Sequence, residues 1–349
     1  MRTARYWHPT AGGAVQCELC PHGCRLPPGA AGLCRVRLHR DGELKAAGYG
    51  AVSSAHVDPI EKKPLHHFLP GSAIFSVGGW GCNFRCRFCQ NWTISQQFRD
   101  DGSRQTPEEV AEAAAACGSV GVAYTYNEPL VGFEFVRDCA ERVRARGLVN
   151  VLVTNGYVNP APAAELLPWV EALNVDIKSM DEAFYRQQCG ARLQPVLDFC
   201  AQAAGAGRHV EITNLIIPGL NDSEDGLRRL AEWVAERLGE RTPLHLSAYH
   251  PQYQCRNPPT PVETLRRAYE LCREKLRYVY VGNVAAGWGE DTACPQCGEV
   301  LIRRRGYAVG PIGLRGHECR RCGRRADLVL SVAEALALGG AQGQSKSPA

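Results

Sequence analysis

Residues 81–92 read Gly81-Cys82-Asn83-Phe84-Arg85-Cys86-Arg87-Phe88-Cys89-Gln90-Asn91-Trp92. The three cysteines have C-x3-C-x2-C spacing and follow the apolar run 73–77, so three thiolates would lie close together on a loop after a strand. An iron–sulfur cubane has four iron corners, and three thiolates leave one iron open to a ligand from outside the protein. A zinc ion would need a fourth ligand, and the nearby His66 and His67 do not have its usual spacing. The loop therefore predicts an iron–sulfur site with one open iron.

Strand-like and helix-like segments alternate through the middle of the chain. β-rich runs occupy residues 73–77, 120–125, 149–154, 173–177, 209–217 and 244–248, with a seventh candidate at 278–281. Segments of helical composition and periodicity occupy residues 107–117, 130–146, 161–170, 181–188, 195–204, 223–238 and 262–276. Repeated βα units with short connections predict an α/β fold, a parallel sheet that closes toward a partial (β/α)6 barrel. A doubly wound open sheet is the alternative.

Polar residues gather at the end of nearly every predicted strand, where a parallel α/β barrel carries its chemistry. They are the three cysteines, residues 124–129, Thr154 and Asn155, Asp176 and Lys178, residues 218–222, and His245 and Ser247. A barrel with a purely structural role would not need this arrangement, so the pattern indicates a catalytic site.

The composition fits a metalloprotein of a reducing compartment. The chain has 349 residues, 17 cysteines and a formal net charge of +4, too small to indicate a polyanion as its partner. Its cysteine content of about 5% is below the roughly 8–10% of a disulfide scaffold, and clustered cysteines in such a protein indicate metal binding or catalysis. No apolar run reaches the roughly 18 residues of a membrane span, and residues 1–10 lack a secretory signal. We therefore expect a cytoplasmic protein with no membrane partner.

The cysteine loop, with an aromatic residue before its third cysteine, resembles that of the radical SAM enzymes. Other segments resemble one branch of them, the radical SAM enzymes of the AmmeMemoRadiSam system, which are related to pyruvate formate-lyase activating enzyme. These segments are residues 58–65, 68 and 70–72, Cys89-Gln90-Asn91-Trp92, Tyr124-Thr125-Tyr126-Asn127-Glu128-Pro129, Val153-Thr154-Asn155-Gly156-Tyr157 and Ile217-Pro218-Gly219-Leu220-Asn221-Asp222. The resemblance extends from about Cys17 to Cys322.

The resemblance implies that Cys82, Cys86 and Cys89 hold a [4Fe–4S] cluster whose open iron binds S-adenosylmethionine (SAM). An electron from an external donor of the flavodoxin or ferredoxin type would cleave SAM to methionine and a 5′-deoxyadenosyl radical, which abstracts hydrogen from an unidentified substrate. The implied SAM-binding residues are Phe88 near the adenine, Asn127 and Glu128 in place of a Gly-Gly-Glu-like motif, Thr154, Asn155, Asp176, Lys178 and His245. Two assignments have structural alternatives. Asp176 and Lys178 share one face of a strand and would pair with each other, and His245 would be a hydrogen-bonded barrel residue.

Two groups of four cysteines flank the predicted barrel. Cys294, Cys297, Cys319 and Cys322 form two C-x2-C pairs and predict a zinc ribbon, whose many arginines fit either charge compensation or contact with nucleic acid. Cys17, Cys20, Cys24 and Cys34 fit either zinc or a second iron–sulfur cluster. The predicted domains are residues 1–45, 46–288 and 289–330, with a helical or disordered tail at 331–349 that we expect to be disordered from residue 339 onward.

Three functions follow from these patterns. The first is a radical SAM enzyme acting on a protein or a small molecule, together with partner proteins of the same system. The second is an activase that forms a glycyl radical on another enzyme. The third is a zinc-stabilised module that binds RNA or protein and uses the barrel as a scaffold. The three-cysteine loop favours the first two.

Overall fold

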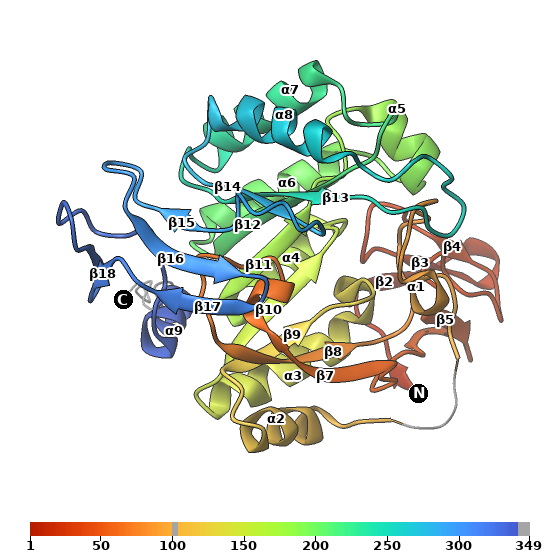
Figure 1. Ribbon diagram of the computed structural model, residues 1–349. Coiled ribbons are helices and arrows are strands. Elements are labelled where there is room, and N and C mark those ends of the chain that lie inside the picture. The colour runs from red at the N-terminus through yellow and green to blue at the C-terminus, as the bar shows by residue number, and fades with distance from the viewer. Residues whose placement is uncertain (100–103, 341–349) are drawn as a thin grey trace, which may run out of the picture.

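The computed structural model describes residues 1–99 and 104–340 and is built around one mostly parallel β-sheet (Figure 1). The strands are β7 (Ser54–Pro59), β8 (Ala73–Gly78), β9 (Gly121–Tyr124), β10 (Val149–Thr154), β11 (Ala172–Asp176), β12 (His209–Ile216), β13 (Leu244–Ala248) and β14 (Val279–Gly282). Strands β8 to β14 are parallel neighbours in chain order, and β7 pairs antiparallel with β8. Because β7 and β14 are the two ends of the sheet order, the barrel is partial. The predicted fold class is confirmed, and the seventh candidate strand forms as β14.

Helices connect the strands, and the longer ones cover the outside of the sheet (Figure 1). They are α1 (Trp92–Ser95), α2 (Pro107–Ala116), α3 (Phe133–Ala145), α4 (Pro160–Leu166), α5 (Glu182–Phe184), α6 (Gln194–Gly205), α7 (Glu224–Arg237) and α8 (Val262–Arg273). Thr106 begins α2 with a reciprocal capping box, in which the side chains of Thr106 and Glu109 each bond the other's backbone N–H. The helix predicted at 181–188 is instead a short α5 followed by a π-helical turn, Tyr185–Cys189.

Strand β7 is not predicted from the sequence. Among its residues only Asp58 is fully buried, because this strand lies at the edge of the sheet and needs no continuous apolar run. The chain after β7 then contributes Lys62, Lys63 and His66 to the lining of the cavity described below.

The N-terminal residues form two small sheets beside the barrel. Their strands are β1 (Arg2–Thr3), β2 (Trp7–Thr10), β3 (Ala14–Cys17), β4 (Arg25–Leu26), β5 (Arg37–Arg40) and β6 (Glu43–Ala46), in the orders β1-β6-β5 and β2-β3-β4. Leu19 and Leu44 belong to the same apolar core as the barrel residue Phe84. Arg37 and Glu134 of α3 form a buried ion pair with an N–O distance of 3.0 Å. The segment is therefore packed firmly against the barrel.

The C-terminal residues form a small β-module and then return to the barrel. The strands are β15 (Thr292–Ala293), β16 (Val300–Arg305), β17 (Ala308–Pro311), β18 (Leu314–Arg315) and β19 (Glu318–Cys319). Helix α9 (Val332–Gly340) packs through Ala335 against barrel residues that include Phe68 and Val151. Residues 339 and 340, which we predicted to be disordered, are the last turn of this helix, and residues 341–349 lie outside the described residues. Within the described ranges, none of the helices combines the length and apolar character needed to cross a bilayer.

Arg304 joins the C-terminal module to the barrel and should contribute strongly to stability. Its side chain is 1% exposed, donates to the Thr292 hydroxyl (2.8 Å) and to the His66 carbonyl (2.7 Å), and lies 3.7 Å from the buried Glu61 carboxylate. Arg304→Ala leaves Glu61 buried without its cation, so we expect the free energy of unfolding to fall by about 3–5 kcal/mol. The exposed neighbour offers a control: Arg303→Ala should stay within about 0.5 kcal/mol of wild type. Equal losses for the two variants in denaturant unfolding would contradict this role.

Candidate active site

A cavity of about 850 Å³ lies at the carboxyl ends of the barrel strands, within the size range of roughly 300–1,000 Å³ typical of ligand sites. Its lining includes every residue that the sequence analysis assigned to the cluster and to SAM: Cys82, Cys86, Cys89, Phe88, Asn127, Glu128, Thr154, Asn155, Asp176, Lys178 and His245. Residues from five different strands and loops thus share one space. Three sulfur ligands and several charged groups at one cavity are a donor set that fits a metal cluster beside a small polar molecule.

The cysteine loop is held from both sides. Asn127 accepts a hydrogen bond from the Gly79 N–H (2.9 Å) and donates to the carbonyls of Trp80 (3.1 Å) and Gly81 (3.0 Å). On the other side, the N–H groups of Arg85 and Arg87 donate to the carbonyls of Cys189 and Gln188. Asn127 therefore positions the loop before Cys82 in addition to lining the cavity.

The three loop thiols favour their protonated form in the protein without bound metal. Burial raises the pKa of Cys82 well above its usual value and that of Cys89 to about 11. For Cys86, a hydrogen bond with the Cys189 thiol raises the pKa even more than burial does. A metal ligand must be a thiolate, so cluster assembly at these residues would release protons.

Glu128 connects the second and third predicted strand ends. Its carboxylate accepts hydrogen bonds from the Thr154 hydroxyl (2.6 Å), the Asn155 N–H (2.7 Å) and the Leu130 N–H (3.0 Å). Burial nevertheless raises the pKa of this carboxyl to about 7, since the hydrogen bonds only partly offset the loss of solvent. A carboxyl that changes charge near neutral pH at the wall of a cavity is typical of a functional site.

Asp176 and Lys178 form an ion pair of 2.8 Å, so the structural alternative for these two residues is correct. Both still line the cavity. Burial disfavours the ammonium of Lys178, but the attraction of the Asp176 carboxylate outweighs burial and raises the pKa of this lysine. The site therefore keeps a positive charge close to the cysteine loop.

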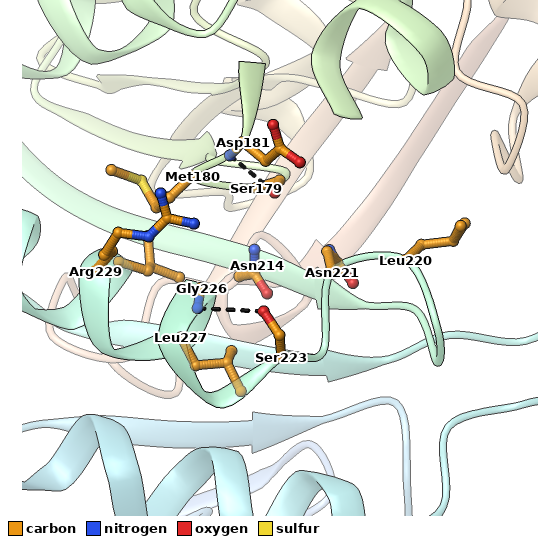
Figure 2. Close-up of a pocket in the computed structure, with 11 residues that line it drawn as sticks. Ser179, Met180, Asp181, Asn214, Leu220, Asn221, Ser223, Gly226, Leu227 and Arg229 are labelled. Carbon is orange, nitrogen blue, oxygen red and sulfur yellow. Dashed lines mark hydrogen bonds between the residues drawn. The ribbon is translucent and has the colours of Figure 1, made fainter. Parts of the chain in front are cut away.

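The motif at residues 217–222 positions Lys178 from outside the cavity. The Asn221 amide donates to the carbonyls of Lys178 (2.7 Å) and Leu215 (2.8 Å), which ties the end of β11 to the end of β12. Asn221 also borders a second cavity of about 60 Å³ between these strand ends and the start of α7 (Figure 2). This small cavity is too small for a substrate, so the motif acts on the main site only through the backbone it holds.

His245 belongs to a buried network centred on Glu211. The Glu211 carboxylate contacts His245 Nε2 (2.6 Å) and His209 Nε2 (2.9 Å) and accepts hydrogen bonds from the N–H groups of His66 and His67. Burial opposes ionisation of Glu211, yet the two histidines hold the pKa of this carboxyl well below its usual range. His245 is thus a hydrogen-bonded barrel residue, as the structural alternative states, and it also faces the cavity.

Several cavity residues were not predicted from the sequence. Lys63 donates to Asp58 (2.7 Å), which also accepts a hydrogen bond from Tyr126. His66 is half-buried, and its buried Nδ1 has no hydrogen-bond partner among the described residues, so this nitrogen can bind a ligand. The C-terminal module adds Arg304 and Tyr307. The lysines and histidines of residues 62–67 could have indicated a place in the cavity from the sequence. Nothing in the sequence near Arg304 and Tyr307 indicates one.

A model of the radical SAM superfamily matches residues 78–234, which include the cysteine loop and strands β9 to β12. The chain belongs to the radical SAM superfamily. It is a radical SAM enzyme whose substrate is unidentified, so we set aside the hypothesis of an inert barrel within a binding module. The family implies a [4Fe–4S] cluster, SAM and a source of electrons.

Individual relatives support this assignment. An uncharacterized protein of Methanocaldococcus jannaschii is 44% identical over 336 residues, which cover 95% of this chain and 100% of that protein. Pyruvate formate-lyase 1-activating enzyme of Escherichia coli (strain K12) is 26% identical over 178 residues, 49% of this chain and 71% of the enzyme. A solved radical SAM methyltransferase from Sphaerobacter thermophilus is similar in structure, with a TM-score of 0.50 and 17% sequence identity. The match covers 63% of this chain and 70% of the methyltransferase chain, and it supports a shared fold only.

The C-terminal cysteines of this radical SAM enzyme form a tight group that could hold a metal ion. The ligand atoms of Cys294, Cys297, Cys319 and Cys322 all lie within 4.8 Å of one another, with Sγ–Sγ distances of 3.7 Å for Cys294–Cys322 and 3.6 Å for Cys297–Cys319. Four thiolates about 2.3 Å from one tetrahedral ion would be separated by about 3.8 Å. The spacing of these four sulfurs therefore suits the predicted metal site.

The N-terminal cysteines lie against the radical SAM cysteine loop. Gly81 has a φ of +81°, and a Cβ atom there would stand 2.2 Å from the Cys34 carbonyl oxygen. His22, between Cys20 and Cys24, places Nε2 2.7 Å from the Asn83 carbonyl. The two cysteine-rich segments thus make direct backbone contact.

Replacing Gly81 should separate these two segments. Gly81→Ala combines an unfavourable left-handed backbone with a clash against a backbone atom, so neither partner can move aside cheaply. Gly118→Ala is the matched control, because Gly118 has a φ of +67° and nothing within 4 Å of its added Cβ. We expect Gly81→Ala to lower the free energy of unfolding by about 2 kcal/mol more than Gly118→Ala does. Equal effects in denaturant unfolding would contradict the contact.

Proposed function

We propose that this radical SAM enzyme belongs to the AmmeMemoRadiSam branch, holds a [4Fe–4S] cluster on Cys82, Cys86 and Cys89, and binds SAM beside it. The observation that carries the proposal is the shared cavity, in which the three thiols and the strand-end residues face one space. When bound, the cluster and SAM supply one-electron cleavage of a carbon–sulfur bond, which yields methionine and a 5′-deoxyadenosyl radical that takes hydrogen from the substrate. The residues of the chain bind and orient these groups and exclude water.

The charged residues suit the two ends of the methionyl group of SAM. Glu128 accepts three hydrogen bonds, and a carboxylate offers about four lone-pair sites, so one acceptor position remains for the SAM amino group. Lys178 offers a positive charge to the SAM carboxylate, with Asp176 holding the ammonium in place. Asn155 donates toward Cys82 Sγ (3.6 Å) and to the Asn83 side chain (2.9 Å), which fixes the loop, while Thr154 fixes Glu128.

The remaining residues suit the nucleoside of SAM. Phe88 is 4% exposed, packs near Phe184 and offers an apolar face for the adenine. The rings of His66 and His245 lie 4.6 Å apart in the lining of the same cavity, where they can meet ribose hydroxyls.

The rest of the chain divides the supporting roles. We assign residues 1–45 to a second cysteine site, residues 46–288 to the catalytic barrel, residues 289–330 to a zinc ribbon on Cys294, Cys297, Cys319 and Cys322, and residues 331–349 to a tail. None of the 17 cysteines forms a disulfide, and this supports a protein that acts in the cytoplasm. A one-electron donor of the flavodoxin or ferredoxin type would reduce the cluster there.

Product formation tests the proposal. Protein reconstituted anaerobically with iron and sulfide, reduced with dithionite and mixed with SAM should release 5′-deoxyadenosine and methionine. A loaded, reduced protein that forms neither product would contradict it.

Activation of a glycyl radical enzyme is a second candidate reaction. The 26% identity with pyruvate formate-lyase 1-activating enzyme over 178 residues favours it. In this case the hydrogen would come from a glycine in a partner protein of the same system. Electron paramagnetic resonance (EPR) of such a partner after turnover should then show a glycyl radical, and turnover of SAM without that signal would favour another substrate.

A further inference from the structure

The N-terminal cysteine group is close enough to the central one to exchange electrons with it. A Cβ atom on Gly81 would stand 2.2 Å from the Cys34 carbonyl oxygen. The bonds from that oxygen to the Cys34 Cα, and from Gly81 to the Cys82 Cα, then place the two cysteine Cα atoms at most about 10 Å apart. The bond from His22 to the Asn83 carbonyl fixes a second point of the same interface. A metal bound by the N-terminal cysteines would therefore be a near neighbour of the central cluster.

The four N-terminal thiols face a common space. The Sγ atoms of Cys34 and Cys24 lie 3.7 and 3.9 Å from the position of a Cβ on Gly32, so both border this glycine. The Cys17 N–H donates to the Cys24 carbonyl (2.9 Å), and the Gly23 N–H donates to the Cys20 carbonyl (3.1 Å), so the chain from Cys17 to Cys24 folds back on itself. The four cysteines thus converge although they come from β3, the loop before β4 and the loop before β5.

The spacing of these thiols differs from that of the zinc-type ribbon. In the ribbon, the thiol of Cys297 is hydrogen-bonded to those of Cys322, Cys319 and Cys294, and all four sulfurs lie within 4.8 Å. In the part of the chain that the structure describes, no other three cysteine, histidine or acidic groups converge so tightly. Among the described residues, the N-terminal and the central cysteines do not form such a tight group. Ligands on separate irons of a cubane stand farther apart than ligands on one ion.

We propose that Cys17, Cys20, Cys24 and Cys34 hold a second [4Fe–4S] cluster that passes electrons to the central cluster. The proposal rests on the central cluster at Cys82, Cys86 and Cys89. In each transfer the reduced second cluster loses one electron and the central cluster gains it, with no bond or proton changing place. A flavodoxin- or ferredoxin-type donor then replaces the electron.

Two features suit this direction of transfer. Cys20 and Cys24 are partly exposed and Leu33 is 48% exposed, whereas Cys17 and Cys34 are buried, so an external donor meets the outer edge of the second cluster. Arg85 lies between the two sites: its guanidinium donates to the carbonyls of Cys82 (2.9 Å) and Phe84 (3.1 Å) and interacts electrostatically with both Cys82 and Cys34. A cation at this position stabilises the extra negative charge of a reduced cluster.

Metal analysis of matched variants tests the second cluster. Wild type reconstituted with iron and sulfide should hold about eight irons and one zinc per chain. The triple variant Cys82→Ala/Cys86→Ala/Cys89→Ala should keep about four irons and one zinc, and the ribbon zinc reports that it is folded. A folded triple variant with no iron, or one holding two zinc ions, would overturn the proposal. If the variant loses its zinc as well, EPR of reduced wild type decides: two interacting cluster signals support the proposal, and a single isolated one overturns it.

The electron-transfer role has a separate readout. Cys20→Ala should keep the central irons but form 5′-deoxyadenosine at least tenfold more slowly than wild type with reduced flavodoxin as donor. The fall should be smaller with dithionite, a small reductant that can reach the central cluster directly. Equal rates for wild type and Cys20→Ala with flavodoxin would overturn the role. Failure of wild type to form product with dithionite would instead contradict the central cluster itself.

Discussion

Cys82→Ala should lose iron from the central site and form 5′-deoxyadenosine at least about 1,000-fold more slowly than wild type, a loss of about 4 kcal/mol in transition-state stabilisation. Among the described residues that line the cavity, three carry thiols, and two thiols cannot keep four irons in place. The Cys82 sulfur is also the one that the Phe84 N–H (3.3 Å) and the Asn155 amide (3.6 Å) approach. Chromatography of the products, together with iron analysis, measures both effects.

Cys117→Ala is the control for this experiment. Cys117 is exposed at the end of α2 and has no place in the cavity lining. Its replacement should leave the iron content and the rate within about twofold of wild type. If Cys82→Ala retained more than a tenth of wild-type activity, the loop would not be the cluster site.

The affinity for SAM should rise with pH through about pH 7 in wild type. The pKa of Glu128 is raised to about 7 by burial, so below that pH the carboxyl is mostly protonated and has lost acceptor capacity for the SAM amino group. Glu128→Gln should bind SAM at least tenfold more weakly at pH 8, about 1.4 kcal/mol, and should show no step near pH 7. Anaerobic calorimetry on the reconstituted proteins measures both. An identical pH profile in Glu128→Gln would show that another group titrates.

The same carboxyl should affect stability in the opposite sense. Because its folded pKa of about 7 exceeds the ordinary value of 4.5, the stability it contributes is complete below pH 4.5 and is lost as pH rises to 7. The difference corresponds to roughly 3 kcal/mol. Glu128→Gln should lack this slope, although its amide nitrogen faces the Asn155 N–H and leaves that donor unpaired at every pH. Glu112→Gln, on the exposed side of α2, should keep the wild-type slope.

Local sequence signals were sufficient for the barrel and for most of its site. The apolar runs and helical periods place Cys82, Glu128 and Lys178 at strand ends, and parallel strands bring their carboxyl ends together. The structure gathers these side chains as predicted. The sequence did not decide which groups these side chains contact, however. The Asp176–Lys178 ion pair and the contact between His245 and Glu211 are visible only in the structure. Glu211, a carboxylate inside an apolar strand, was a usable signal that a buried partner must exist.

Contributions from distant segments could not be predicted. Arg304 and Tyr307 reach the cavity from a module more than two hundred residues after the cysteine loop, and nothing near them in the sequence indicates this. Strand β7 was missed because an edge strand with a single buried residue lacks an apolar pattern. Both misses concern segments whose place is set by packing against the barrel rather than by their own composition.

Electron–nuclear double resonance tests the central claim most directly. Reduced, reconstituted wild type mixed with SAM carrying nitrogen-15 in its amino group should show hyperfine coupling between the cluster and that nitrogen, since three cysteines leave one iron open to SAM. Cys82→Ala treated in the same way should show none. A fully loaded and reduced wild type without this coupling would contradict the account.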